Sequence, residues 1–457
     1  MTKQVKWLWL VLAVIMTAST ALANDENPYL RNSEIPNALI YLPSITDSTI
    51  IATNGDYAWW IWGKTMRNTP RGEQASWESK FGIVRMCTIY SDVLGIDITE
   101  ENTPAIYQLL KRSGETGTAS VTKIKGTYFR KRPFLIMNED PWGQYDSYNE
   151  LEKSSSYPSS HTSFGWGSAL ALAEMAPHMQ DTILRRGYEY GISRVIVGAH
   201  WRSDVDAAII CASTTFARSH GSQEFASDMQ AAKQEYMRIT GLSESQITNE
   251  ASPSIAKILD PPLLPDTYQY YGDITPYWQA KTERDSLRGE QAVADACLED
   301  DVIISGFAQS AGIDISSSAT PRIKSLIVTL KSMFGDYAVS MKDYWYRNRP
   351  YVHLGDTTSV PDDEDTYSNE SSYPSRHALI GWGIALVLAE VMPDRQDNIL
   401  KRGYDFAWSR VITGFQYPSD VQAGCVMAAC FLAKLHNDPK FNNLLNSAMQ
   451  EYASLNQ

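Results

Sequence analysis

Apolar residues recur along the chain at the spacing of α-helices. Within residues 223–240, Phe225, Met229, Ala232 and Tyr236 stand at positions i, i+4, i+7 and i+11, so that they share one face of an amphipathic helix. No segment shows the sustained alternation of apolar and polar residues that is typical of half-buried strands. The pattern therefore predicts an all-α protein with several helices in each part of the chain.

Two continuous apolar stretches occupy similar places in the two halves of the chain. Residues 163–175 are followed by Pro177, and residues 379–392 are followed directly by Pro393. Because proline is not tolerated in a helix interior, both stretches are predicted to be helices that end there. Neither reaches the roughly 20 apolar residues that a membrane-spanning helix needs, and Glu390 interrupts the second one.

One unit occurs twice in the chain. Short motifs recur at an offset of 217 positions in the first part of the unit and of 216 positions later in it. The recurring motifs are Arg71-Gly72-Glu73-Gln74 with Arg288-Gly289-Glu290-Gln291, Gly95-Ile96-Asp97-Ile98 with Gly312-Ile313-Asp314-Ile315, Pro158-Ser159 with Pro374-Ser375, and Arg186-Gly187-Tyr188 with Arg402-Gly403-Tyr404. This long, nearly constant offset indicates duplication of a whole domain and not a short-period repeat.

The two copies are predicted to form tandem domains. Residues 241–262 are rich in Ser, Asn and Pro, which is typical of a linker, and Pro261-Pro262 leads into the second copy. The predicted domains are therefore residues 24–245 and residues 246–457. We expect them to pack against each other as an internal pseudo-dimer.

Residues 1–23 have the features of a secretory signal peptide. Lys3 and Lys6 give a basic start, residues 7–16 form a short apolar run, and Ala21-Leu22-Ala23 fits a cleavage site. The run is short for a membrane anchor, which is the alternative interpretation. The mature protein is therefore predicted to start after this site, to be periplasmic or secreted, and to have no membrane span.

The charge of the chain argues against some classes of partner. The formal net charge is −13, and removal of residues 1–23 takes away Lys3 and Lys6 but no acid, which leaves −15. Proteins that bind nucleic acids or anionic membranes need basic surfaces, so we expect neither partner. With 43% hydrophobic and 20% charged residues, the composition is that of a globular protein. Any site for a phosphorylated ligand must therefore be a local cationic pocket.

The chain contains an odd number of cysteines, so at least one is expected to be free or paired with another molecule. The sequence has no CxxC pair and no Cys/His cluster with the spacing of a zinc site. Most of the cysteines are therefore predicted to be buried structural residues. They are Cys87, Cys211, Cys297, Cys425 and Cys430.

Three short blocks in the first copy carry candidate chemistry. They are Lys125 with Arg132-Pro133, then Pro158-Ser159-Ser160-His161-Thr162, and then Ser193-Arg194 with His200 and Asp204. Three cations match the oxygens of a phosphoryl group, and a helix that starts at the serines offers N–H groups to an anion. If helical, His200 and Asp204 would share a face, and the carboxylate could fix the tautomer of a nucleophilic imidazole. His161 could protonate a leaving group.

In this order, the blocks resemble the signature of the type-2 phosphatidic acid phosphatase (PAP2) superfamily: K-x6-R-P, P-S-G-H and S-R-x5-H-x3-D. With an export signal and no membrane span, the chain is most similar to the bacterial class A non-specific acid phosphatases. The resemblance covers nearly all of both copies. It implies hydrolysis of small phosphate monoesters at acidic pH without a metal or other cofactor. Glu139-Asp140 and residues 362–365 are accordingly interpreted as solvated loop acids and not as metal ligands.

The resemblance also implies a role for each residue of the first copy. His200 would be the nucleophile that takes the phosphoryl group, Asp204 would orient it, and His161 would act as general acid and then as general base. The phosphate oxygens would be bound by Lys125, Arg132, Ser159, Ser160 and Arg194. Ser160 replaces the glycine of the family pattern and can serve through its backbone N–H, provided that its φ is not strongly positive.

The second copy keeps most of these residues but lacks the nucleophile. It retains Lys342, Arg349, Ser375, His377, Arg410 and Asp420. Gln416 occupies the position of His200, and an amide cannot form a phosphoenzyme. Arg376 occupies the glycine position, and its long side chain could fill the phosphate pocket. The second copy is therefore predicted to be catalytically inactive, and to act as a scaffold or bind an anion without turnover.

Two other functions are compatible with the same blocks. Vanadium-dependent haloperoxidases share them because vanadate mimics phosphate, but this sequence lacks obvious halide-site features and its motifs are closer to those of the phosphatases. A phospholigand-binding protein with little catalysis is the second alternative. The intact His161, His200 and Asp204 argue against it for the first copy, and it stays open for the second.

Overall fold

The computed structural model describes residues 28–44, 55–145 and 148–455. Within these ranges the regular structure is helical throughout, without a strand, and the all-α prediction is confirmed. None of the helices in the same ranges is long and apolar enough to cross a bilayer. The predicted signal peptide, residues 1–23, lies outside the described residues.

Each long helix of the first half has a counterpart in the second half. The first half contains α2 (Asp56–Met66), α3 (Pro70–Glu78), α4 (Ile83–Leu94), α5 (Pro104–Thr127), α8 (Ser160–Met175), α9 (Gln180–Ile196), α10 (Arg202–Ser219) and α11 (Gln223–Thr240). Their counterparts, in the same order, are α14 (Tyr271–Lys281), α15 (Leu287–Ala294), α16 (Asp300–Ala311), α17 (Pro321–Met341), α20 (Arg376–Val391), α21 (Gln396–Ile412), α22 (Pro418–Leu435) and α23 (Pro439–Leu455). Short helices lie between them: α6 (Pro133–Ile136), α7 (Tyr148–Lys153), α12 (Glu244–Ile247), α13 (Ile255–Ile258), α18 (Pro350–Leu354) and α19 (Glu364–Tyr367).

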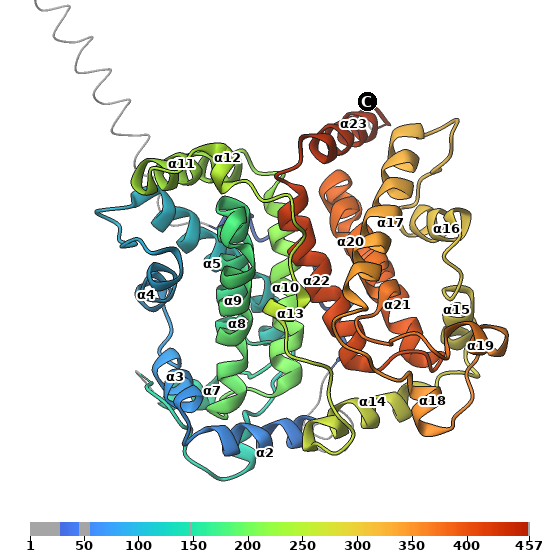
Figure 1. The fold of residues 1–457 in the computed structure, drawn as a ribbon, viewed down its shortest axis with the longest axis horizontal. Helices are drawn as coiled ribbons and strands as arrows, with labels where there is room; N and C mark the ends of the chain where they lie inside the picture. Colours follow the sequence, from blue (N-terminus) through green and yellow to red (C-terminus); the bar gives the residue numbers. More distant parts are fainter. Residues whose placement is uncertain (1–27, 45–54, 146–147, 456–457) are drawn as a thin grey trace, which may run out of the picture.

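A buried helix forms the centre of each half. In the first half α5, α9 and α10 pack around α8, and in the second half α17, α21 and α22 pack around α20 (Figure 1). A helix that is largely apolar on every side can be covered on every side, and all residues of α8 from His161 to Met175 are buried. The two helices predicted from apolar stretches are thus confirmed. The amphipathic helix is confirmed as α11, because the four residues of its predicted apolar face are buried.

The two halves contact each other through equivalent helices. Helix α10 packs against α20, α22 packs against α8, and α10 also contacts α22; the last two lie at the centre of Figure 1. In this contact the rings of His220 and His436 stack with centroids 3.4 Å apart. The N-terminal segment also reaches the other half, because the backbone N–H of Asn37 donates to Asp397 Oδ1 at 2.8 Å. The helix contacts of one half thus mirror those of the other.

All five cysteines are free thiols. Four of them are buried and Cys297 is exposed, which confirms the prediction that most are buried. Burial raises the pKa of the Cys87 thiol to about 12. Because the thiolate is the reactive form, this side chain is inert near neutral pH and acts by packing.

The junction between the copies is packed against the first half. Helix α13 lies against α9, and its Ile255 and Ile258 are completely buried. The backbone N–H of Ser254 donates to Asp181 Oδ1 of α9 at 2.9 Å. Composition predicted a linker, and this segment does connect the copies. Its few aliphatic side chains nevertheless anchor it, because burial of each such side chain stabilises the fold by about 1.5–3 kcal/mol.

We expect Ile258→Ala to lower the free energy of unfolding by about 2–5 kcal/mol, because the substitution removes buried carbons and leaves a cavity. The matched control is Leu264→Ala in the same segment, where the residue is 61% exposed. That change should stay within about 0.5 kcal/mol. Calorimetry of both variants measures the difference, and equal effects would contradict a packed junction.

Candidate active site

The three predicted blocks meet at one end of the first helical bundle. Lys125 lies in the last turn of α5, Arg132 directly precedes α6, and Ser159 caps α8. Arg194 lies in the last turn of α9, and Asp204 lies in the first turn of α10. Residues that are far apart in the sequence therefore come together as predicted, each placed by the end of a different helix.

His200 and Asp204 are in contact, but they do not share a helical face. His200 lies in the turn between α9 and α10, and α10 begins only at Arg202. The backbone N–H of Trp201 donates to Asp204 Oδ2 at 2.8 Å, and this cap turns the carboxylate back toward the loop. His200 Nδ1 lies 3.4 Å from Asp204 Oδ2. The expected helical arrangement is therefore wrong, although the predicted pair exists.

A contact with an arginine fixes which nitrogen of His200 lacks a proton. Arg132 Nη1 lies 2.8 Å from His200 Nε2, and because a guanidinium can only donate, Nε2 accepts. The proton of the neutral ring is then on Nδ1, the atom that faces Asp204. Burial, reinforced by Arg132, Lys125 and Arg194, holds the pKa of His200 well below its usual range. The ring is therefore neutral and its Nε2 lone pair faces the cations.

Asp204 is held by a buried guanidinium that the motifs did not reveal. Arg130 Nη1 donates to Asp204 Oδ1 at 2.5 Å, and Arg130 Nη2 donates to Asp56 Oδ2 at 2.7 Å. All three side chains are buried. The repeat carried a signal for both missed residues, because Arg347 and Asp273 recur 217 positions after Arg130 and Asp56.

His161 is fixed by a hydrogen bond and by a stacked ring. Its Nε2 donates to the backbone carbonyl oxygen of Glu78 at 2.8 Å, which leaves Nδ1 as the unprotonated nitrogen of the neutral ring. The imidazole stacks on Tyr190 with centroids 4.4 Å apart. Burial, reinforced by Arg194, holds the pKa of His161 well below its usual range. Sequence reasoning missed Glu78 and Tyr190, which have only similar residues, Asp295 and Phe406, in the second copy.

Of the three predicted cations, Arg132 and Arg194 are buried and Lys125 is partly buried, and none of them forms an ion pair with a described residue. Lys125 Nζ and Arg194 Nη1 donate to backbone carbonyl oxygens at 2.5 and 3.2 Å, and Arg194 Nε has no hydrogen-bond partner. Burial, together with Arg132, lowers the pKa of Lys125 to about 7. Burial and Arg194 lower the pKa of Arg132 to about 10. Like charges held this close in a desolvated site favour the arrival of an anion.

The start of α8 completes the anion site. The hydroxyl of Ser159 accepts from the backbone N–H of Thr162 at 3.2 Å. Ser160 is the first residue of α8, and among the described non-glycine residues a positive φ occurs at Asn138 and not at Ser160. The condition for serine in place of glycine is therefore met. Unpaired N–H groups at the start of a helix attract anions.

The second half repeats this framework around a different central residue. Arg347 Nη1 donates to Asp420 Oδ1 at 2.6 Å, in the same way that its counterpart holds Asp204. Gln416 stands where the first half has His200. With its amide oxygen turned to the guanidinium, Gln416 accepts from Arg349 Nη1 at 2.7 Å. Glutamine thus keeps the contact with arginine and offers no imidazole nitrogen.

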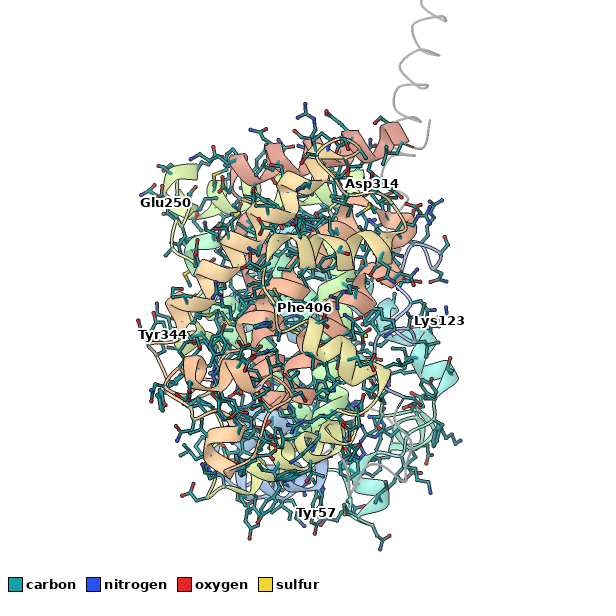
Figure 2. The ribbon with its side chains drawn as sticks, turned by 90° about the vertical axis from the view of Figure 1, so that its right-hand side faces the viewer. Tyr57, Lys123, Glu250, Asp314, Tyr344 and Phe406 are labelled. Carbon is teal, nitrogen blue, oxygen red and sulfur yellow. The ribbon has the colours of Figure 1, made fainter. Side chains whose placement is uncertain are left out.

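The other residues of the second site occupy equivalent places, with one correction. Figure 2 views the molecule from the side of the second half, where Phe406 lies near the middle and stacks on His377 with centroids 5.7 Å apart. Ser375 caps α20 and Arg410 lies in the last turn of α21, as their counterparts do in the first half. Lys342 directly follows α17, whereas Lys125 lies within the last turn of α5. Arg376 is exposed, so it lies at the rim and does not fill the pocket, as the sequence suggested it could.

A group of residues with the spacing of metal ligands lies away from the predicted site. Among the described residues, His220, Glu390 and His436 bring ligand atoms within 4.8 Å of one another, at the end of α10 opposite to Asp204. Glu139, one of the loop acids, pairs with Arg67 at 3.4 Å. Around His200 the side chains are cations, a second imidazole and one engaged carboxylate, a set that suits an anion better than a metal ion.

Two regions of the chain, residues 115–224 and 325–443, match the family model of the PAP2 superfamily. The chain belongs to the PAP2 superfamily. The matched regions contain all the predicted site residues of each half, so the PAP2 fold is present twice. This confirms the family resemblance and the interpretation of the chain as a tandem duplication of helical domains.

Relatives of this PAP2 protein include enzymes of about half its length. A non-specific acid phosphatase from Providencia stuartii is 39% identical over 230 residues, which is 50% of this chain and 92% of the relative. One from Salmonella typhimurium is 35% identical over 217 residues, 47% of this chain and 85% of the relative. An acid phosphatase from Zymomonas mobilis is 32% identical over 224 residues, 46% of this chain and 84% of the relative.

We expect Arg130→Met to reduce phosphatase activity strongly and to destabilise the protein by about 3–5 kcal/mol, because it leaves two buried carboxylates without a cation. The matched variant is Arg347→Met in the second half, where the same pairing exists. It should cost similar stability and leave the activity of the first half in place. Steady-state kinetics and thermal unfolding of both variants test this, and equal loss of activity would contradict the assignment.

Proposed function

We propose that this protein is an exported acid phosphatase that hydrolyses small phosphate monoesters in its first domain, residues 24–245, through a phosphohistidine at His200. The observation that carries the proposal is the buried, neutral His200, whose Nε2 contacts Arg132 and whose ring lies in the field of Lys125 and Arg194 as well. The acid phosphatase activity named for three half-length relatives supports it. We include export because residues 1–23 fit a signal peptide.

In this proposal the phosphate group of the substrate sits between the cations and the start of α8. Lys125, Arg132 and Arg194 bind its oxygens, together with the N-terminal groups at Ser159 and Ser160. Binding requires Arg132 to exchange its contact with His200 Nε2 for a phosphate oxygen. Phosphoryl transfer depends mostly on positioning and on neutralising the charge of the equatorial oxygens, so no metal ion is needed for this reaction.

The chemistry proceeds in two balanced steps. His200 Nε2 attacks phosphorus, an N–P bond forms, the bond to the leaving oxygen breaks, and His161 gives that oxygen a proton. In the second step His161 takes a proton from water, the water oxygen attacks phosphorus, and the N–P bond breaks to release orthophosphate. Asp204 compensates the positive charge that His200 carries in the intermediate.

The lowered pKa values of His200 and His161 explain why the reaction is expected to run at acidic pH. A nucleophile must be unprotonated, and the lowered pKa of His200 keeps it neutral even in acid. The acid must begin protonated, yet burial and Arg194 also lower the pKa of His161 in the empty site. A bound phosphate dianion opposes the field of the cations and so raises the pKa of His161. Low pH then raises the fraction of His161 that carries the proton.

We propose that the second domain, residues 246–457, is catalytically inactive because Gln416 has no nucleophilic nitrogen. We further propose that the two domains act as an internal pseudo-dimer. The mirrored contacts of α10 with α20 and of α22 with α8 support this arrangement, since a two-fold interface uses the same surface of both partners.

The first test is hydrolysis of p-nitrophenyl phosphate at acidic pH with EDTA present. Wild-type protein should be active, and His200→Ala should lower kcat by at least about a thousandfold, because removal of a nucleophile stops the covalent step. Gln416→Ala is the matched substitution and should retain the rate. Activity that survives His200→Ala would refute the assignment. An inactive wild type that gains peroxidase activity with vanadate would favour a haloperoxidase.

The role of His161 as general acid predicts a dependence on the leaving group. His161→Ala should lower kcat/KM for an alkyl phosphate, which reports formation of the phosphoenzyme and not its hydrolysis, by about 10²–10⁴-fold, the usual contribution of general acid catalysis. The loss should be much smaller with p-nitrophenyl phosphate, whose phenolate leaves without a proton. For the wild type, kcat/KM on alkyl phosphates should fall as pH rises above the acid range, because His161 loses its proton. An equal loss on both substrates would indicate a purely structural role.

A further inference from the structure

The second site contains a buried arginine without an anionic partner. Arg410 is 1% exposed, and neither its Nε nor its Nη1 has a hydrogen-bond partner among the described residues. Its guanidinium contacts the ring of Phe415 at 4.2 Å from the centroid, which is a weak substitute for a carboxylate. An unpaired buried charge costs several kcal/mol, so this position needs a ligand to explain it.

Two further cations, Lys342 and Arg349, belong to the same site. Neither of them has a buried carboxylate as its ion-pair partner. Lys342 Nζ donates to the carbonyl oxygen of Ser371 at 2.6 Å and forms no ion pair with a described residue. Arg349 reaches Glu370 at 3.7 Å, but the carboxylate is 57% exposed and the pair is long. Burial and Arg349 lower the pKa of Lys342 to about 7 and that of Arg410 to about 9.

The buried carboxylate of this site, Asp420, is already engaged. Asp420 accepts from Arg347 at 2.6 Å and from the backbone N–H of Tyr417 at 2.8 Å. It therefore compensates a different guanidinium. Arg349 acts on the pKa of both Lys342 and Arg410, and neither of those two cations forms an ion pair with a described residue.

The start of α20 adds N–H groups to the site, and a cavity opens beside its first residue. Ser375 caps this 16-residue helix, and Arg376 stands exposed at its first position. This cavity has a volume of about 430 Å³, and its wall includes Arg376 and Lys331 together with the acidic residues Glu299 and Asp363. Where the first half has Ser160, the second half thus places an additional cation at the entrance.

We propose that the second site binds orthophosphate and holds it without turnover. The buried Arg410, with Lys342, Arg349 and the start of α20, would contact the oxygens, and Arg376 would close the rim. Gln416 keeps Arg349 in place through its amide oxygen and forms no bond to phosphorus. The choice of orthophosphate rests on the proposed function, because the first domain would release this anion; the cation cluster itself stands independently of that function.

Equilibrium dialysis of the full-length protein against [32P]orthophosphate tests the proposal. Wild-type protein should bind two equivalents, one in each domain. Arg410→Met should weaken one of them by about a hundredfold, because two charge-assisted hydrogen bonds are lost, and Arg194→Met should weaken the other. Lys342→Met is a second variant for the same site in case Arg410→Met does not fold. Hydrolysis of p-nitrophenyl phosphate, measured in parallel, reports separately on the first domain.

The outcomes separate the two proposals. Loss of one equivalent in Arg410→Met or Lys342→Met, in protein that is folded by its thermal unfolding, supports the second site. An active wild type that binds a single equivalent, sensitive to Arg194→Met alone, overturns the second site and leaves the phosphatase intact. An inactive wild type that still binds phosphate in an Arg410-dependent manner overturns the proposed function and supports the second site.

Discussion

The pairing of Arg130 with Asp204 and Asp56 is the interaction on which the active-site geometry depends. One guanidinium, buried with both carboxylates, connects α2, the segment before α6 and the first turn of α10. Loss of Arg130 would leave two buried carboxylates without a cation. The network therefore fixes the loop of His200 in one position, and this is why an imidazole outside any helix can be held as precisely as a helical residue.

The interior near His200 contains more positive side chains than its carboxylates compensate. Arg130 is compensated by two carboxylates, whereas Lys125, Arg132 and Arg194 have no ion-pair partner among the described residues. A protein with a formal net charge of −13 thus concentrates positive charge in one desolvated place. Long-range attraction of an anion is weak under these conditions, and binding must rely on short, charge-assisted hydrogen bonds in a low dielectric.

The duplication repeats the buried arginine–aspartate pairing around a different central residue. Arg347, Asp420 and Asp273 repeat the buried pairing at nearly the same distances, and the cations recur with it. Replacement of one imidazole by the amide of Gln416 keeps the hydrogen bond to arginine and removes the ring nitrogen. The electrostatic character of the site therefore persists in the second half without the imidazole.

The sequence by itself determined the helical class, the duplication and the main residues of the site, because each depends on a pattern that is local or repeated. Apolar spacing specifies α11, and apolar stretches before proline specify α8 and α20. The order and spacing of the blocks predicted that His200, His161 and the cations form one site. A proposed signal peptide at residues 1–23 is also a local pattern, but it lies outside the described residues.

Only the tertiary structure decided how these residues meet. The carboxylate of Asp204 reaches His200 through a helix cap and not along a helical face, since the turn at residues 197–201 cannot be read from a four-residue spacing. The carbonyl of Glu78 that orients His161 comes from a distant helix end. Arg130 and Arg132 are two positions apart, but only Arg130 forms ion pairs with described residues. Burial and partner choice depend on contacts between distant segments, and for that reason no local pattern encodes them.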